Sequence, residues 1–326
     1  MTTTLAERTR TLPWIALGVV YVLWGSTYLA NRYIIVSMPP LLASGSRFLG
    51  GGLLLGVVVL VVAGPPAFAL TRAQLGTGAL SGLLLPAWGN GLVILAQSQV
   101  ASGLTALLIA SVPLYIAVLR ALTGDRPRRA TVLGVLVGAV GLAVLVLVRP
   151  GGGSGGVSGS AWWGPPLVLL AGLGWATGTF AATRLSVPAN PFALATVQQL
   201  VGGTILLVVG TVAGERIDLA AVAPVSWWAW VYMTLLVSLA AFSSYAYALA
   251  NLPVSTVATY AYVNPVIAVL LGVVVAAERF SALQLVGGGI VLLAVVMVIA
   301  AERPSRRGAR GSGPPTPRAA ARTPPG

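Results

Sequence analysis

The sequence predicts an all-α integral membrane protein with ten transmembrane helices in two inverted five-helix repeats. Three observations predict this fold. The chain has 326 residues, of which 57% are hydrophobic and 8% are charged, and its mean hydropathy is +0.93. A water-soluble domain carries about 25% charged residues. In addition, short polar connections separate ten apolar runs, and the two halves of the chain share residues at a constant spacing.

Each apolar run has about the 17 to 25 residues that a helix needs to cross a hydrocarbon core of about 30 Å. Helices are expected because lipid offers no hydrogen-bond partner to the backbone, and a barrel would need alternating strands of about 10 residues. The first run follows two arginines as a signal peptide would, but it lacks a small-residue cleavage pattern, so we expect a retained span. The runs cover residues 13–31, 40–62, 74–96, 100–122, 131–148, 164–183, 192–213, 226–249, 253–276 and 282–300.

The distribution of arginines predicts the orientation of the chain in the membrane. With both termini in the cytoplasm, fourteen arginines lie on the cytoplasmic side and four on the other side, while Arg47 lies inside a span. Residues 1–12 are then a cytoplasmic arm. Residues 301–326, rich in Pro and Arg, are expected to form a disordered cytoplasmic tail near anionic lipid headgroups. The net charge of +13 is thus an orientation signal, and no nucleic-acid partner is expected.

The two halves, residues 13–148 and 164–300, look like copies joined by the Gly- and Ser-rich linker 149–163. Trp24 matches Trp175, and Pro113 matches Pro265. Because each copy has five spans, an odd number, the second copy must enter the membrane from the opposite face. Inverted repeats of this kind are typical of secondary transporters, whose halves move about a central site.

The residue types that are missing narrow the possible functions. The chain has no Lys, His or Cys, which excludes a Schiff-base lysine, an imidazole base, a thiolate nucleophile and a His or Cys metal site. Its six acidic residues are scattered along the chain, and none lies in the middle of a span. We therefore expect no enzyme, no cofactor and no metal. A secondary transporter is the favoured interpretation, and a channel or a membrane scaffold remains the alternative.

Four short motifs lie in or beside the spans. They are Trp24-Gly25-Ser26-Thr27, Pro39 followed by Arg47, Ala101-Ser102-Gly103-Leu104-Thr105-Ala106-Leu107 leading to Pro113, and Asn264-Pro265 leading to Glu278-Arg279. With these motifs the chain resembles the EamA-type branch of the drug/metabolite transporter superfamily over residues 12–300. The resemblance implies a permease of the bacterial inner membrane, often an exporter, with a central cavity formed by the first four helices of each half and peripheral fifth and tenth helices. This chain differs from the family pattern in having Asp125 where Glu is more usual.

Aromatic and polar side chains inside the spans are the candidate substrate-cavity residues. Lipid-facing positions favour Leu, Ile and Val, and interfacial Trp and Tyr lie near span ends. The alternative is that these side chains join helices to one another. Arg47 either faces the cavity or extends its long side chain to the membrane interface. The expected partners are a small amphipathic substrate and membrane lipid. The candidate set is Trp24, Arg47, Trp88, Asn90, Trp175, Gln198, Gln199, Tyr245, Tyr260 and Asn264.

Two prolines inside spans are candidate gate or kink positions, because a proline removes a helical donor and frees a carbonyl one turn earlier. They are Pro113 and Pro265. Acidic residues beside arginines at span ends, Glu278 and Asp125, are expected in solvated turns.

Other residues have a local structural interpretation. Ser281 and Gln284 have the spacing of a capping box that opens the tenth helix. Small-residue faces in the fifth and tenth spans, at Gly134, Gly138 and 287–289, let helices approach closely. A homodimer interface is the alternative use of these glycines.

The topology can be tested with single cysteines, since the chain has none of its own. Cysteine at position 154 should react with a membrane-impermeant thiol reagent from outside intact cells, and cysteine at position 123 should react only from the cytoplasmic side. Labelling of both positions from the same face would reject the ten-span topology.

Overall fold

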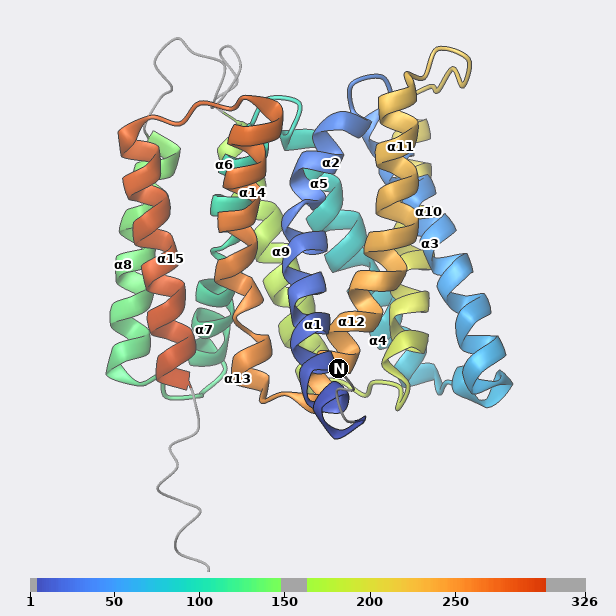
Figure 1. Ribbon diagram of the computed structural model, residues 1–326, viewed down its shortest axis with the longest axis horizontal. Helices are drawn as coiled ribbons and strands as arrows, with labels where there is room; N and C mark the ends of the chain where they lie inside the picture. Colours follow the sequence, from blue (N-terminus) through green and yellow to red (C-terminus); the bar gives the residue numbers. More distant parts are fainter. Residues whose placement is uncertain (1–4, 148–162, 303–326) are drawn as a thin grey trace, which may run out of the picture.

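The computed structural model describes residues 5–147 and 163–302, which form a bundle of helices joined by turns (Figure 1). The described residues contain no strand element, which confirms the all-α prediction. Most of the predicted linker 149–163 and of the predicted tail 301–326 lies outside the described residues, as do residues 1–4 of the predicted arm.

The first half contains five helical segments, numbered 1 to 5 below. A short 3-10 turn, η1 (Pro65–Phe68), precedes segment 3. The segments are α1 (Leu5–Gly25) with α2 (Thr27–Ile34); α3 (Pro40–Ala63); α4 (Arg72–Gly82) with η2 (Leu83–Asn90) and α5 (Gly91–Ala96); α6 (Ser102–Ile109) with α7 (Val112–Leu122); and α8 (Arg129–Leu147).

The second half contains segments 6 to 10. They are α9 (Gly164–Arg184); α10 (Pro191–Val212); α11 (Pro224–Tyr232) with η3 (Met233–Ala241) and α12 (Phe242–Asn251); α13 (Val254–Val257) with α14 (Tyr260–Ala276); and α15 (Ala282–Glu302). Both η2 and η3 are π-helical, and they occupy the third segment of their respective halves.

Nine helical stretches of the described residues are long and apolar enough to cross a membrane. Segment 9 falls short because a break at Ala258 and Thr259 divides it and leaves α14 as an apolar helix of 17 residues. Large apolar side chains cover the outside of the bundle. Val62, Leu122 and Val212, for example, are 81%, 78% and 82% exposed. Such a surface is typical of contact with lipid tails.

Helix contacts repeat between the halves. Figure 1 shows α8 beside α15 at one edge of the bundle and α3 with α10 towards the other edge, and both pairs are in contact. Segment 3 packs through η2 on α9, the first helix of the second half, and α12 of segment 8 packs on α1 in the same way. Helix α1 begins and α15 ends on the same side of the bundle (Figure 1). These contacts agree with the predicted correspondence of the halves.

Glycines allow α3 and α10 to cross with their backbones in contact. A Cβ added at Gly203 would lie 2.6 Å from the backbone nitrogen of Leu49 and 2.9 Å from the carbonyl oxygen of Gly45. Only a residue without a side chain fits there, because real Cβ atoms do not approach backbone so closely. This crossing fixes the relative depth of the two helices in the bundle.

The glycines of the fifth and tenth spans also serve packing within the chain. Gly134 faces Val298 and Gly138 faces Ala294, both on α15, while Gly287 faces Val144 on α8. The structural interpretation of these glycines is therefore confirmed. The homodimer remains a prediction that these three positions do not support.

Replacing Gly203 by Ala should lower the unfolding free energy of the detergent-purified protein by about 1 to 3 kcal/mol, because the added methyl group overpacks the crossing. Gly289→Ala is the matched control, since beyond the neighbouring backbone of its own helix no atom lies within 4 Å of a Cβ at that position. Thermal or SDS-induced unfolding measures both variants. Equal stability of the two variants would contradict the close crossing.

Candidate functional site

A cavity of about 620 Å³ lies between the two halves. Segments 1 to 4 and 6 to 9 line it, α15 contributes only Val298 and Ile299, and α8 contributes no residue. This distribution agrees with the expectation of a central cavity with peripheral fifth and tenth helices. Pockets that hold small organic molecules have volumes of about 300 to 1,000 Å³. The cavity is therefore large enough for a metabolite.

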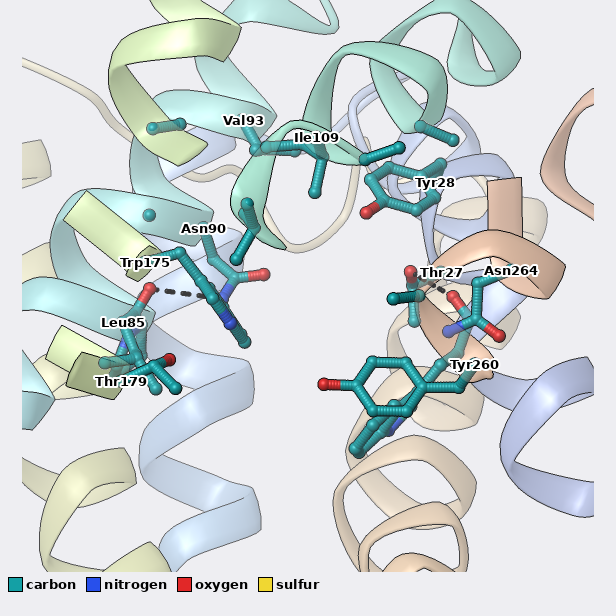
Figure 2. Close-up of a pocket in the computed structure, with 18 of the residues that line it drawn as sticks. Thr27, Tyr28, Leu85, Asn90, Val93, Ile109, Trp175, Thr179, Tyr260 and Asn264 are labelled. Atoms are coloured by element: carbon teal, nitrogen blue, oxygen red, sulfur yellow. Dashed lines mark hydrogen bonds between the residues drawn. The ribbon is translucent and has the colours of Figure 1, made fainter. Parts of the chain in front are cut away.

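Most of the predicted cavity residues lie around this space. Figure 2 shows Asn90 and Trp175 on one wall and Tyr260 and Asn264 on the facing wall, with Val93 and Ile109 near one end. The matched residues Trp24 and Trp175 both line the cavity, one from each half. The predicted residues that line it are Trp24, Arg47, Asn90, Trp175, Gln198, Gln199, Tyr260 and Asn264.

A polar group lies where α3, α10 and η3 meet. Arg47 on α3 and Gln199 on α10 are 3% and 9% exposed, so Arg47 does not extend to the membrane interface in this structure. A Cβ at Gly51, one helical turn after Arg47, would lie 2.7 Å from Gln199 Oε1 and 2.9 Å from Ser238 Oγ. Arg47, Gln199 and Ser238 all line the cavity, and we call them the polar group.

An aromatic group lies on segments 1, 8 and 9. The ring centroid of Trp24 is 5.1 Å from those of Tyr245 and Tyr260, and the last two are 5.8 Å apart. Edge-on and tilted contacts at these distances stabilise aromatic clusters. Trp24 and Tyr260 line the cavity, whereas Tyr245, which the sequence also placed there, is not among the lining residues and contacts both of these rings.

The two π-helical segments bring polar side chains to the cavity in equivalent ways. Asn90 Nδ2 donates to the carbonyl oxygen of Leu85 at 3.3 Å, and Ser238 Oγ donates to that of Met233 at 3.3 Å. In both cases the acceptor lies five residues earlier, at the spacing of the backbone hydrogen bonds of a π-helix. The sequence analysis missed Ser238 because its role depends on the π-helical geometry of η3.

Trp88 does not belong to the cavity, contrary to the prediction. Its side chain is 41% exposed, packs against Gly174 on α9 and donates a hydrogen bond of 3.0 Å from Nε1 to the carbonyl oxygen of Leu170. The position of a tryptophan in the middle of a span therefore did not identify the face it occupies.

Both predicted gate prolines line the cavity, but their helices differ. Segment 4 is interrupted at Ala110 and Ser111, and α7 starts directly before Pro113. In contrast, α14 continues through Pro265, and the interruption of segment 9 lies earlier, between α13 and α14. Only Pro113 therefore accompanies a break in its helix.

Three residues of α2 complete one wall, although the sequence analysis did not select them for the cavity. Thr27, Tyr28 and Asn31 all line the space, and Figure 2 shows Thr27 and Tyr28 beside Asn264. Gln97 Nε2 donates to the carbonyl oxygen of Tyr28 at 2.8 Å and ties α2 to the end of α5. Tyr28 lies four residues and Asn31 seven residues after Trp24, which places them on the same helix face, and this spacing was the signal available in the sequence.

Glu278 is buried, contrary to the expectation of a solvated turn. Its side chain is completely enclosed and accepts hydrogen bonds from Ser102 N at 2.8 Å, Ser102 Oγ at 2.7 Å, Gly103 N at 3.0 Å and Arg32 Nη1 at 2.6 Å. It joins α2, α6 and the turn after α14 at the end of the bundle where α2 and α14 finish, here called the distal end. Asp125, by comparison, is 44% exposed and pairs with Arg120 and Arg184, as expected for a solvated turn.

The predicted capping box at the start of α15 is confirmed. Ser281 N donates to Gln284 Oε1 at 2.9 Å, and Gln284 N donates to Ser281 Oγ at 3.2 Å. The cap satisfies two backbone donors that would otherwise lack partners at a helix start. It fixes the turn that carries Glu278.

Comparison with known proteins gives matches along most of the chain. The profile of the EamA-like transporter family matches twice, at residues 12–147 and 162–300. The uncharacterized inner membrane transporter YedA of Escherichia coli K12 is 37% identical over 87% of this chain and 89% of its own length. A chloroplastic WAT1-related protein of Arabidopsis thaliana is 26% identical over 88% of this chain and 69% of its own length.

A solved structure described only as the crystal structure of a protein superposes on this chain with a TM-score of 0.59. It is 18% identical, and the match covers 87% of this chain and 94% of the other. At this identity the superposition shows a shared fold alone.

Replacing Glu278 by Gln should lower the unfolding free energy by about 1.5 to 3 kcal/mol, because hydrogen bonds to a buried charged acceptor are lost and Arg32 is left unpaired. Asp125→Asn is the matched control at an exposed acid and should change stability by no more than about 0.5 kcal/mol. Unfolding of both purified variants measures the difference. A Glu278→Gln protein as stable as Asp125→Asn would contradict the importance of the buried cluster.

Proposed function

Because the chain belongs to the EamA-like transporter family and is a multi-pass protein of the bacterial inner membrane, we propose that it is a secondary active transporter. It moves a small amphipathic metabolite or drug-like compound, most simply as an exporter, by alternating access of the central cavity to the two sides of the membrane. The observation that carries this proposal is the cavity of about 620 Å³ between the halves, lined by side chains from segments 1 to 4 and 6 to 9.

In this proposal the ten segments are ten transmembrane helices in two inverted repeats, residues 13–148 and 164–300, and both termini are cytoplasmic. The double match of the family profile and the recurring helix contacts support the repeat. The excess of arginines on the side that carries the start of α1 supports the orientation. The distal end is then the outer end of the bundle.

Glu278 and its partners Arg32, Ser102 and Gly103, here called the Glu278 cluster, form a contact that alternating access has to break. It links Arg32 of the first half to Glu278 of the second at the outer end, and the backbone of Ser102 and Gly103 holds the same carboxylate. While these bonds are intact, α2, α6 and α14 are tied together on that side of the cavity. Opening to the outside therefore requires the cluster to separate.

Transport should be tested with the purified protein in liposomes. A thermal-shift screen of metabolites would find ligands, and counterflow of any ligand would then distinguish a transporter from the alternatives. Counterflow requires a binding site that reorients with substrate bound. Unsaturable flux without counterflow would instead identify a channel, and ligand binding without flux would identify a scaffold or receptor.

Arg47→Lys and Gln199→Leu should both weaken the apparent affinity of transport about ten- to a hundredfold while leaving the amount of folded protein near normal. The reason is that lysine lacks the planar fork of the guanidinium and leucine lacks the amide, and one such contact contributes about 1.5 to 3 kcal/mol. Trp88→Phe is the control, since Trp88 lies outside the cavity. Wild-type kinetics in Arg47→Lys would reject the cavity role of Arg47.

A further inference from the structure

The cavity contains a buried cation, and none of the residues that the structure describes offers it an anionic partner. Arg47 is 3% exposed, and its Nε atom has no hydrogen-bond partner. Among the described residues Arg47 forms no hydrogen bond or ion pair, and its guanidinium carbon lies 3.8 Å above the ring centroid of Phe48. An unpaired charge in the membrane interior is unfavourable, and it is found where a site needs it.

Within residues 5–147 and 163–302, no carboxylate balances this cation. The residues that line the cavity include no Asp or Glu. The acids nearest to the spans are engaged elsewhere. Asp125 pairs with Arg120 and Arg184, Glu278 pairs with Arg32, and Glu215 accepts hydrogen bonds from the backbone at the start of α3. The cavity therefore carries a net positive charge from one side chain.

The rest of the lining favours a planar apolar body. Trp24 and Tyr260 present the aromatic group, and Trp175 lies on the opposite wall (Figure 2). The side chains of Asn31 and Asn264 add amide groups to the lining, and their oxygen atoms have no hydrogen-bond partner among the described residues. A ligand with one anionic group and a flat ring satisfies the cation and the aromatic walls together.

We propose that the substrate is an amphipathic monoanion, with its anionic group on the guanidinium of Arg47 and its ring between the aromatic walls. This inference rests on the proposed transport function and narrows its substrate class. A zwitterion fits less well, because the lining has no carboxylate to receive an ammonium group. A dianion fits less well because Arg47 is the only cationic side chain among the residues that line the cavity.

A charge series on one ring system tests the proposal. The probes are 2-naphthoate, the neutral 2-naphthamide, the cation 2-naphthylmethylamine and the zwitterion 3-(2-naphthyl)alanine. Their binding to the purified wild-type protein, Arg47→Gln and Arg47→Lys is measured by calorimetry. The amide reports the integrity of the aromatic site in each variant, because it does not depend on an ion pair.

Wild-type protein should bind 2-naphthoate about ten- to a hundredfold more tightly than the amide, the cation and the zwitterion. Arg47→Gln should bind the naphthoate and the amide equally, and Arg47→Lys should keep part of the preference because it keeps the charge. The inference is overturned if any other probe binds the wild type as tightly as naphthoate, if the preference survives in Arg47→Gln, or if naphthoate binds more weakly than about 1 mM.

The same probes separate this inference from the proposed function. Counterflow of naphthamide in liposomes without binding of naphthoate would retain the transporter and reject the anionic substrate. Tight, Arg47-dependent binding of naphthoate without counterflow would retain the anion site and reject transport.

Discussion

The architecture depends on one constraint, that backbone polar groups in lipid must find hydrogen-bond partners within the protein. Lipid-facing edges are therefore built from unbroken helices, among them α8 and α15. Breaks and π-helical stretches occur in segments 1, 3, 4, 8 and 9, each of which lines the cavity. Polar side chains add donors at these stretches, as Asn90 does for Leu85 and Ser238 for Met233. Irregular backbone and the candidate site thus coincide for the same physical reason.

The positions of the spans follow from hydropathy because each span must be apolar along its whole length. The predicted run 40–62 corresponds to α3 (Pro40–Ala63), and 282–300 corresponds to α15 (Ala282–Glu302). Hydropathy does not determine the rotation of each helix about its own axis. Lipid-facing and buried faces are both apolar here, so periodicity carries little information about which side chain faces inward. Trp175 lines the cavity and Trp88 does not, although both lie in the middle of their spans.

The sequence analysis also failed to predict interactions between distant parts of the sequence. An acid beside an arginine suggests a local, solvated pair, but Glu278 is held by Arg32 and by the backbone of Ser102 and Gly103. The left-handed conformation of Ala277, with φ of 51°, turns the chain so that Glu278 points back into the bundle. Local pattern does predict local structure, as the capping box of Ser281 and Gln284 shows. It does not report which helix end a carboxylate will cap.

The crossing of α3 and α10 explains how a charge can be kept inside the membrane without a partner. Backbone contact at Gly45 and Gly203 leaves these helices little freedom to slide, so Arg47 and Gln199 are held at fixed depth. A flexible site would let the guanidinium find a carbonyl or reach the interface. A rigid site prevents both, so the guanidinium of Arg47 remains available to pair with a ligand. In the proposed transport cycle, the close-packed crossing and the interrupted segments have complementary roles, since one holds the binding group in place while the others supply the movable walls.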